Sequence, residues 1–459
     1  MRMIGRYKVC GRLGKGGMGS VYKVKLPGLE RIVALKLLDP AEIMVDLLGM
    51  DELKRQFMYE ARIMAGLNHP HIAGIWDLDE TDSGLPYFIM EYSCNNLGTL
   101  TGESYMVEEP TRRLTVDTAV KYAIQTLSGL NRMHHEGVIH RDIKPYNLLI
   151  TADDSIKIID FGLSKLRGED EFGAPPGMKV GSPYYAAPEQ EMDPKSADAR
   201  ADIYAVGVTL FRMLTGLLPY DEESGEAMRL AKAHNPELDW AWQEFFAKAL
   251  ALDPADRHET CAEMIAELEY LEEDWEDRRD RICSLPDADE DIQRLEDTLD
   301  RNPGLRDVPV KTGPVTPDQA FFLDRLGRPK EYYRCAFKAE ADQTVRDEAH
   351  GLMWQAKGSP YPLTWQRARE YVDQLNEVGF AGYDDWRIPT VEELMTLIRE
   401  APELGDFCVD SLFDPQARQV WSCDRRTFIQ SWCMDGAMGF IGFHDHTCPL
   451  WVRAVRSDH

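Results

Sequence analysis

The sequence HRDIKPYNLLI occupies residues 140–150, and an Asp-Phe-Gly string begins ten residues later at Asp160. A carboxylate such as Asp142 can accept a proton from an attacking hydroxyl, and Lys144 can neutralise a phosphoryl group in transfer. Asn147 and Asp160 offer the oxygen ligands that Mg²⁺ prefers. Each string alone has a structural explanation, such as a surface salt bridge, so the interpretation depends on what accompanies it.

A glycine-rich segment lies near the N-terminus, where Gly14, Gly16 and Gly19 form the pattern G-x-G-x-x-G. Residues without a Cβ let backbone amides approach phosphate oxygens closely. The pattern lies between two strand-forming runs, which argues against a dinucleotide-binding fold, where a helix must follow. Lys36, in the strand-forming run IVALKLL, can hold phosphates, and Glu60 in a predicted helix can pair with it.

Further motifs complete the set: Ala187-Pro188-Glu189, then Asp202 in DIYAVGVTLF, then Arg257. Their order and spacing resemble the eukaryotic-like Ser/Thr protein kinases, and the opening GKGGMGSVYK is similar to the bacterial branch of that family. The resemblance covers roughly residues 5–275. It implies a bilobal α+β fold in which Asp202 anchors the regulatory spine, and Glu189 and Arg257 form a buried structural ion pair.

The same resemblance implies the site. The N-lobe would span about residues 5–92 and the C-lobe about 93–275, with ATP and Mg²⁺ bound in the cleft between the lobes. The residues implied in catalysis are Asp142, Lys144, Lys36 and Glu60, and those implied to hold the metal are Asn147 and Asp160. The residues implied to bind the nucleotide are Leu13, Gly14, Lys15, Gly16, Gly17, Gly19, Val21, Ala34, Lys36, Met90, Glu91, Ser93 and Leu149.

Substrate class and regulation follow from neighbouring residues. Lys144 and the string GSPYYAAPE, with Ser182, resemble the Ser/Thr pattern and not the tyrosine pattern. No threonine lies between Asp160 and Glu189, and the acidic trio at 169–171 either substitutes in part for a loop phosphate or is simply solvated. The stretch 94–114 is longer than a minimal connection, and we interpret it as a tolerated loop insertion in preference to a segment that shapes substrate access.

Composition narrows the possible partners. The chain has 459 residues, 44% of them hydrophobic, and a formal net charge of −27. Such a surface repels nucleic acid and anionic lipid. No apolar run approaches the roughly 18 residues that cross a bilayer, and the start lacks a signal-peptide core. We therefore expect a cytoplasmic protein that binds neither nucleic acid nor membranes.

The middle of the chain is acidic. Residues 259–300 hold 17 Asp and Glu against 4 Arg, with apolar residues at helical spacing. This pattern predicts two amphipathic helices with solvated acidic faces, the alternative being a docking surface for a basic partner. Prolines at positions 303, 309, 314 and 317 indicate a linker, so 276–320 would join two domains.

The C-terminal segment, 321–459, is rich in Trp, Tyr and Gly. A helix is predicted from Trp365 to Leu375, and Thr390 with Glu393 forms a capping box for a second helix. The segment resembles the bacterial C-type-lectin-like (Lcl-like) domains, which implies an α+β fold with a loop-rich binding face. Neither a Glu-Pro-Asn nor a Gln-Pro-Asp triplet occurs in the sequence, so calcium-dependent sugar binding is not supported.

Two side-chain sets in this segment have alternative interpretations. His444, His446 and Cys448 alternate and would face one side of a strand, with Cys423 and Cys433 upstream. A zinc site is chemically feasible, but the spacing matches no standard module, so we favour a mixed core-and-surface strand. The tryptophans are interpreted as core packing. They are Trp354, Trp365, Trp386, Trp421, Trp432 and Trp451.

The sequence thus predicts a Ser/Thr protein kinase that transfers the γ-phosphoryl group of ATP to a protein hydroxyl. Its C-terminal module would recruit a protein target or sense a ligand. The competing hypothesis is an ATP-binding pseudokinase scaffold that acts through the C-terminal domain. Phosphorylation of that domain in cis is compatible with the first hypothesis.

Overall fold

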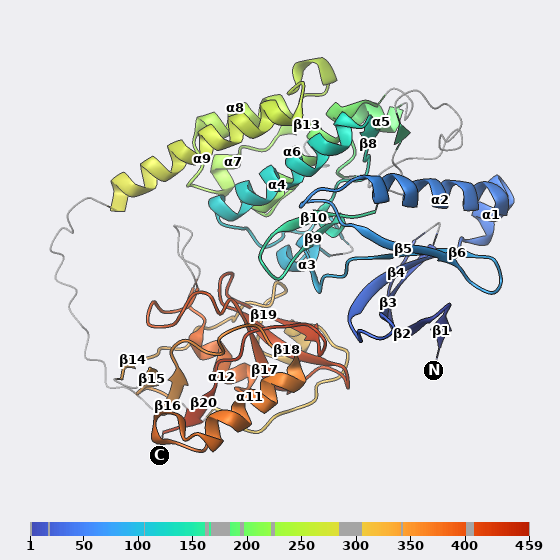
Figure 1. Cartoon of the computed structure of the whole chain (residues 1–459). Coiled ribbons are helices and arrows are strands. Elements are labelled where there is room, and N and C mark those ends of the chain that lie inside the picture. Colours follow the sequence, from blue (N-terminus) through green and yellow to red (C-terminus); the bar gives the residue numbers. More distant parts are fainter. Residues whose placement is uncertain are drawn as a thin grey trace. The chain divides into compact units, whose positions relative to one another are not determined.

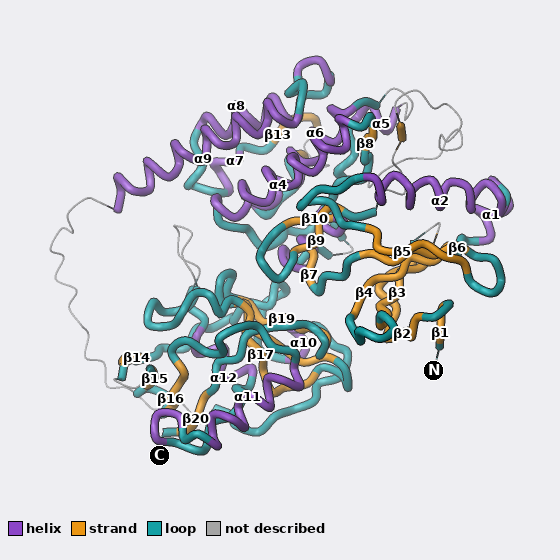
Figure 2. Tube along the Cα trace, viewed as in Figure 1, coloured by secondary structure: helices purple, strands orange, loops and turns teal. Residues whose placement is uncertain are grey.

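The chain forms two compact units, Met1–Ser284 and Leu285–His459, which are treated separately below (Figure 1). Both units combine helices and sheets in this computed structural model, as expected for an α+β protein (Figure 2). The structure describes residues 2–16, 19–104, 106–160, 165–166, 184–192, 197–221, 225–283, 305–340, 343–400 and 408–458.

Some sequence predictions concern positions outside these ranges. They are Gly17, Phe161, Gly162, Ser164, the acidic trio 169–171, Ser182 and the second acidic helix near 291–300. Among the described helices, none is long and apolar enough to cross a membrane.

The N-terminal half of the first unit is an antiparallel sheet with the strand order β1-β2-β3-β4-β6-β5. Its strands are β1 Met3–Ile4, β2 Tyr7–Lys15, β3 Gly19–Lys25, β4 Ile32–Leu38, β5 Ile75–Glu80 and β6 Pro86–Met90. Helix α2 (Met50–Gly66) follows the short α1 (Glu42–Leu48) and buries Leu53, Phe57 and Met64 on one side. The Phe57 ring lies 5.1 Å from the Phe88 ring of β6, so the apolar stripe of the helix packs on the sheet.

The second half of this unit is mainly helical. Its long helices are α4 (Val116–His135), α6 (Ala199–Thr215), α8 (Trp240–Ala249) and α9 (Cys261–Cys283), the first of the two predicted acidic helices. Helix α4 packs against both α6 and α9. Nearly every residue of α6 is buried, which makes it the centre of this half.

Short elements connect these helices and position the loops of the unit. They are β7 Asn95–Asn96, α3 Leu97–Thr101, β8 Val138–Ile139, the 3₁₀ turn Pro145–Asn147, β9 Leu148–Ile150, β10 Ile156–Ile158, β11 Lys165–Leu166, α5 Pro188–Met192, β12 Tyr220–Asp221, β13 Gly225–Met228, α7 Ala231–His234 and the 3₁₀ turn Pro254–Asp256. Strand β9 pairs with both β7 and β10, and the segment 140–150 therefore leads into a small three-stranded sheet.

The C-terminal unit has two antiparallel sheets with the orders β14-β15-β16-β20 and β17-β18-β19. The strands are β14 Phe337–Ala339, β15 Thr344–Asp347, β16 Leu352–Gln355, β17 Gln419–Arg425, β18 Gln430–Asp435, β19 Phe440–Asp445 and β20 Val455–Ser457. The helices are α10 Pro317–Ala320, α11 Trp365–Glu377, the 3₁₀ turn Phe380–Gly382 and α12 Val391–Leu397.

The core of the C-terminal unit confirms two sequence predictions. The side chains of Trp354, Trp421 and Trp432 are fully buried, and Trp365 and Trp386 nearly so, which supports core packing. The capping box is formed: Thr390 Oγ1 accepts from the Glu393 amide, and Glu393 Oε2 accepts from the Thr390 amide.

Candidate active site

An ionic cluster links three segments of the first unit. Lys36 on β4 donates from Nζ to Glu60 Oε1 on α2 at 2.7 Å and to Asp160 Oδ1 at 2.8 Å. Lys36 and Glu60 are buried, whereas the Asp160 side chain is 50% exposed. The pairing of Lys36 with Glu60, predicted from the sequence, is thus present, and the lysine also binds the carboxylate of the Asp-Phe-Gly string.

The pKa shifts in this cluster follow from burial and pairing. Burial opposes the charge of Lys36, but the two carboxylates outweigh it and raise the lysine pKa above its usual value. The Lys36 charge lowers the pKa of Asp160. Burial raises the pKa of Glu60 despite its ion pair. A charged ammonium group can bind the oxygens of a polyphosphate, and an exposed carboxylate beside it can bind a cation. Lys36 and Asp160 therefore could hold both kinds of ligand side by side.

A second cluster surrounds Asp142. Lys144 Nζ donates to Asp142 Oδ2 at 2.8 Å, and Asn147 Nδ2 donates to the same oxygen at 3.0 Å and to the Asp142 carbonyl at 2.8 Å. These bonds orient the Asn147 amide and leave its oxygen as the atom that can bind a cation. The amide of Ile159, next to Asp160, donates to the Asn147 carbonyl at 3.0 Å, so the two candidate metal ligands are joined through the backbone.

Buried Asp202 fixes the backbone before Asp142. Its carboxylate accepts from the amides of His140 (2.9 Å) and Arg141 (2.7 Å) and bonds His134 Nε2 at 2.8 Å. Burial opposes ionisation of Asp202, but the His134 hydrogen bond and nearby charge lower its pKa. Arg141 and Asp160 both have positive φ, 69° and 66°, so the backbone is strained in both of these segments.

The nucleotide side of the site is formed by β2, β3, β4 and β6. A Cβ on Gly19 would lie 2.5 Å from the Leu37 carbonyl oxygen, so this glycine is required for close strand pairing. A Cβ on Gly14 would meet nothing within 4 Å and one on Gly16 only the Gly19 carbonyl oxygen at 3.9 Å, which leaves room for a ligand. In the sheet Val21 pairs with Lys36, and Ala34 pairs with Met90 at the end of β6.

The other predicted nucleotide residues lie as follows. Met90 and Ala34 are buried, and Leu149 on β9 is half-buried. Glu91 binds Lys157 at 3.0 Å, and the Ser93 hydroxyl donates to the Ile150 carbonyl. Leu13 is 46% exposed, and Lys15 is paired with Asp39 at 3.5 Å.

The expected structural ion pair is confirmed. Arg257 donates from Nη1 and Nη2 to the two carboxylate oxygens of Glu189, both at 2.8 Å, and its side chain is fully buried. Further guanidinium hydrogen bonds reach the carbonyls of Ala251, Leu252 and Arg200. This bidentate ion pair anchors the segment 184–192 to the helical half of the unit.

The interpretation of 94–114 as a tolerated insertion is wrong. This stretch contains α3 and Glu103, a buried carboxylate that sequence reasoning missed. Glu103 accepts from Arg212 Nε at 3.1 Å and from the Tyr185 hydroxyl at 2.7 Å. The three side chains are almost fully buried, so Glu103 anchors the segment in the core. Only the length of the segment was noticeable in the sequence, because its partners lie far away along the chain.

In the C-terminal unit the five residues weighed as a zinc set have other surroundings. His444 is buried on β19, whereas His446 bonds the Ser431 hydroxyl at 2.8 Å and stacks on Trp365 with ring centroids 4.8 Å apart. Cys423 and Cys433 are free thiols. These contacts support the mixed core-and-surface strand.

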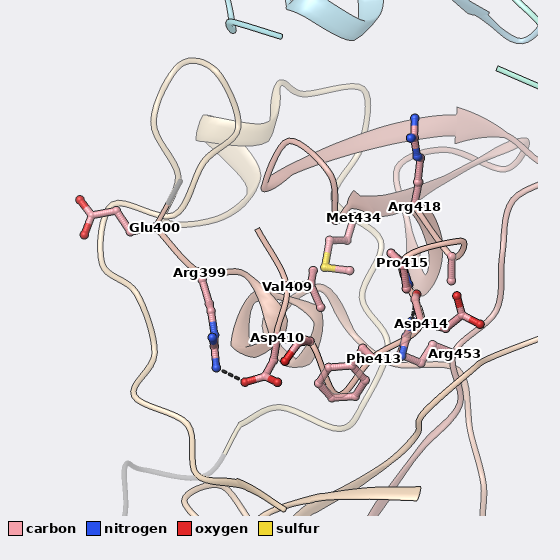
Figure 3. A pocket seen from close by; sticks show the side chains of 13 residues that line it. Arg399, Glu400, Val409, Asp410, Phe413, Asp414, Pro415, Arg418, Met434 and Arg453 are labelled. Carbon is pink, nitrogen blue, oxygen red and sulfur yellow. Dashed lines mark hydrogen bonds and ion pairs between the residues drawn. The ribbon is translucent and has the colours of Figure 1, made fainter. Parts of the chain in front are cut away.

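A cavity opens in the C-terminal unit, and Figure 3 shows the side chains that line it. Arg453 lies at its base, buried, with the guanidinium 4.8 Å from the Phe413 ring centroid. Its Nη2 donates to the Asp414 carbonyl at 3.1 Å, and its Nε has no partner among the described residues. Burial lowers the Arg453 pKa to about 10. Other prominent lining residues are Arg399, Asp410, Arg418 and Met434.

The first unit, with its N-terminal sheet followed by a helical half, has the architecture of a protein kinase. Residues 7–276 match the protein kinase domain family, and residues 343–456 match the Lcl C-terminal domain family. Because the first match spans more than half of the chain, this protein belongs to the protein kinase family.

Curated relatives carry the corresponding names. The chain is 33% identical over 276 residues to serine/threonine-protein kinase PrkC of Bacillus subtilis, covering 58% of this chain and 40% of PrkC. It is 30% identical over 302 residues to serine/threonine-protein kinase pkn3 of Myxococcus xanthus, covering 61% and 52% of the two chains. The alignment with the probable kinase PknB of Lactococcus lactis gives 33% identity and covers 57% and 41%. This chain therefore spans about half or less of each relative's length.

Proposed function

We propose that this protein is an active Ser/Thr protein kinase that transfers the γ-phosphoryl group of ATP to a protein hydroxyl. The observation that carries the proposal is the pair of clusters around Lys36 and Asp142, in which every charged group that the reaction needs is present. A pseudokinase scaffold is the alternative. The intact catalytic set disfavours it.

The proposed roles follow from the contacts. Asp142 would orient the substrate hydroxyl and accept its proton, while Lys144 would neutralise charge on the phosphoryl group. Lys36, oriented by Glu60, would hold phosphate oxygens. Mg²⁺ fits the donor set of a carboxylate and an amide oxygen at Asp160 and Asn147, and when bound it would neutralise phosphate charge.

The nucleotide would lie against the sheet. Gly14, Gly16, Gly17 and Gly19, with Leu13 and Lys15, would cover the phosphates. Val21, Ala34 and Leu149 would enclose adenine, and Met90, Glu91 and Ser93 would border it. Support comes from the open space at Gly14 and from the pairing of Ala34 with Met90 at the sheet end.

The Ser/Thr class is proposed on two grounds. Lys144 binds Asp142 directly, which places its charge where a hydroxyl would be phosphorylated. The relatives named above are called serine/threonine-protein kinases. We infer a cytoplasmic protein with protein substrates and no nucleic-acid or membrane partner, in keeping with the net charge of −27.

We propose that the C-terminal unit has a C-type-lectin-like fold that recruits a target or senses a ligand. Its support is the cavity beside Arg453, which combines apolar walls with guanidinium groups and carboxylates and so suits a ligand that has both charged and apolar parts. Reversing two charges at its rim, with Arg399→Glu and Arg418→Glu, should leave phosphorylation of a generic substrate such as casein unchanged. The same variant should change which proteins become phosphorylated in a cell extract.

The deciding experiment is intact-mass analysis of the purified full chain after incubation with MgATP. Asp142→Asn and a matched surface variant, Asp117→Asn on α4, are run beside the wild type. Mass gains of about 80 Da per phosphoryl group in the wild type and Asp117→Asn, but not in Asp142→Asn, would establish the activity. Mapping the modified residues would separate cis from trans action. No transfer to the chain or to casein would favour the scaffold.

A further inference from the structure

Three potential metal ligands come together in the C-terminal unit, outside the cavity of Figure 3. Cys335 lies just before β14, Asp347 ends β15, and His350 lies in the turn that leads to β16 (Figure 1). One ligand atom from each residue lies within 4.8 Å of the other two. No other cluster of this kind is found among the described residues.

The contacts converge on a single nitrogen. His350 Nδ1 lies 2.6 Å from Asp347 Oδ2 and 3.8 Å from Cys335 Sγ. One ring N–H can be donated fully to only one of these groups, whereas a cation between the three atoms would satisfy all of them. The Cys335 thiol donates to the carbonyl oxygen of Thr396 on α12 at 3.0 Å, so this oxygen is a fourth potential ligand atom beside the cluster.

Burial and charge favour a divalent ion. The His350 and Asp347 side chains are 3% and 0% exposed. A thiolate and a carboxylate together carry two negative charges, which a divalent cation would cancel, leaving a neutral buried centre. The other Asp347 oxygen accepts the amides of Ala336 and Ala349, both at 3.1 Å, so the carboxylate is already fixed in direction.

We propose that this chain binds one Zn²⁺ ion through Cys335 Sγ, Asp347 Oδ2 and His350 Nδ1. Binding would release the thiol proton to solvent, and the neutral imidazole would move its single proton from Nδ1 to Nε2, which frees Nδ1 for the metal. Tetrahedral zinc requires an S···N separation of about 3.5 Å and an N···O separation of about 3.3 Å. The first is already close to that value, and the second is reached when the carboxylate moves back by about 0.7 Å once the metal replaces the shared proton.

The fourth position would be filled by the Thr396 carbonyl oxygen or by a water molecule. The ion would then join the segment before β14, the end of β15 and the turn before β16. Such a site is structural, because the side chains of Asp347 and His350 are buried and that of Cys335 is partly buried. Zinc binding should therefore raise the melting temperature of this unit.

The test uses the full chain, freed of metal with a chelator and then titrated with Co²⁺ as a spectroscopic substitute for zinc. A thiolate-to-cobalt charge-transfer band at one equivalent supports the site, and its loss on adding Zn²⁺ supports zinc preference. The kinase site does not interfere, because its candidate ligands are oxygens. Absence of that band in the folded wild type overturns the proposal without need of any variant.

Variants then assign the ligand. Cys335→Ser should abolish the band and weaken zinc binding roughly 100-fold in competition with a chromophoric chelator, since it removes one of three protein ligands. Cys423→Ser, which changes another free thiol of the same unit, should leave both readouts unchanged. Circular dichroism verifies that each variant is folded. An unchanged band in folded Cys335→Ser, or its loss in Cys423→Ser, would contradict the assignment.

Discussion

Two buried ionic contacts of the kinase unit have similar distances and different uses. In the first, Lys36 contacts Glu60 and Asp160 at 2.7 and 2.8 Å; in the second, Arg257 contacts Glu189 twice at 2.8 Å. Arg257 is fully buried and also bonds backbone carbonyls, whereas Asp160 is half-exposed. The buried Arg257–Glu189 contact therefore stabilises the fold. The Lys36 contact, whose Asp160 carboxylate is accessible, can take part in a reaction.

This comparison predicts that mutation of the Arg257–Glu189 contact lowers mainly the stability of the unit. Mutation of the Lys36 contact should lower mainly the rate of phosphoryl transfer. The C-terminal unit offers an extension, since the Asp347 and His350 side chains of its Cys335–Asp347–His350 cluster are as buried as the Arg257 pair.

Arg257→Ala should lower the free energy of unfolding of the kinase unit by about 3–5 kcal/mol, because Glu189 is left without its partner in a largely buried place. Differential scanning calorimetry should show a melting temperature lower by roughly 10 °C. Lys121→Ala removes an ion pair whose lysine side chain is 41% exposed, and it should change the transition little. Equal effects of both variants would show that the buried Arg257–Glu189 pair contributes no more to stability than an exposed ion pair.

Lys36→Met should reduce the phosphoryl-transfer rate roughly 100- to 1000-fold, because the ammonium group that would stabilise phosphate charge is lost. The measurement is single-turnover transfer to casein with saturating ATP. Lys121→Met serves as the control and should retain the wild-type rate. A Lys36→Met enzyme with normal turnover would exclude a role for the ionic cluster in chemistry.

The stability of the C-terminal unit should depend on pH through His444. Burial lowers the pKa of His444 to about 4, below the roughly 6.5 of an unfolded histidine. The unfolded chain thus binds a proton that the folded chain excludes, so stability is present above pH 6.5 and is lost as the pH falls toward 4. The expected loss is about 3 kcal/mol over this window.

The check is calorimetry between pH 4 and 7 on the wild type and His444→Gln. The variant should lose less stability than the wild type as the pH falls. Parallel curves would show that the histidine does not titrate in this way.

Glu60→Gln should have the smallest effect, a reduction of about 10-fold in transfer rate, because the amide oxygen can still accept from Lys36 but supplies no charge. The measurement is the rate as a function of ATP concentration, which separates nucleotide binding from turnover. Asp51→Asn, near the start of the same helix, is the control. A loss as large as that of Lys36→Met would mean that Glu60 itself contributes to the chemistry.

Much of this protein could be predicted from its sequence. The groups around Asp142 lie within a few residues of one another, so a short motif contains both their identity and their spacing. The run IVALKLL coincides with β4, and the spacing from Trp365 predicted α11, because period and capping are local properties. Family membership follows from such motifs in order, and the comparison with the kinase family agrees.

Other features were decided only by the tertiary structure. Glu103 meets Arg212 across 109 positions of sequence, so nothing local marks 94–114 as part of the core. The cluster of Cys335, Asp347 and His350 was not foreseen either, because their spacing matches no metal motif and only the pairing of β15 with β14 and β16 brings them together. Motifs whose residues are close in sequence can be recognised from the sequence alone. The partner of a buried charge depends on how distant segments pack, and only the tertiary structure shows it.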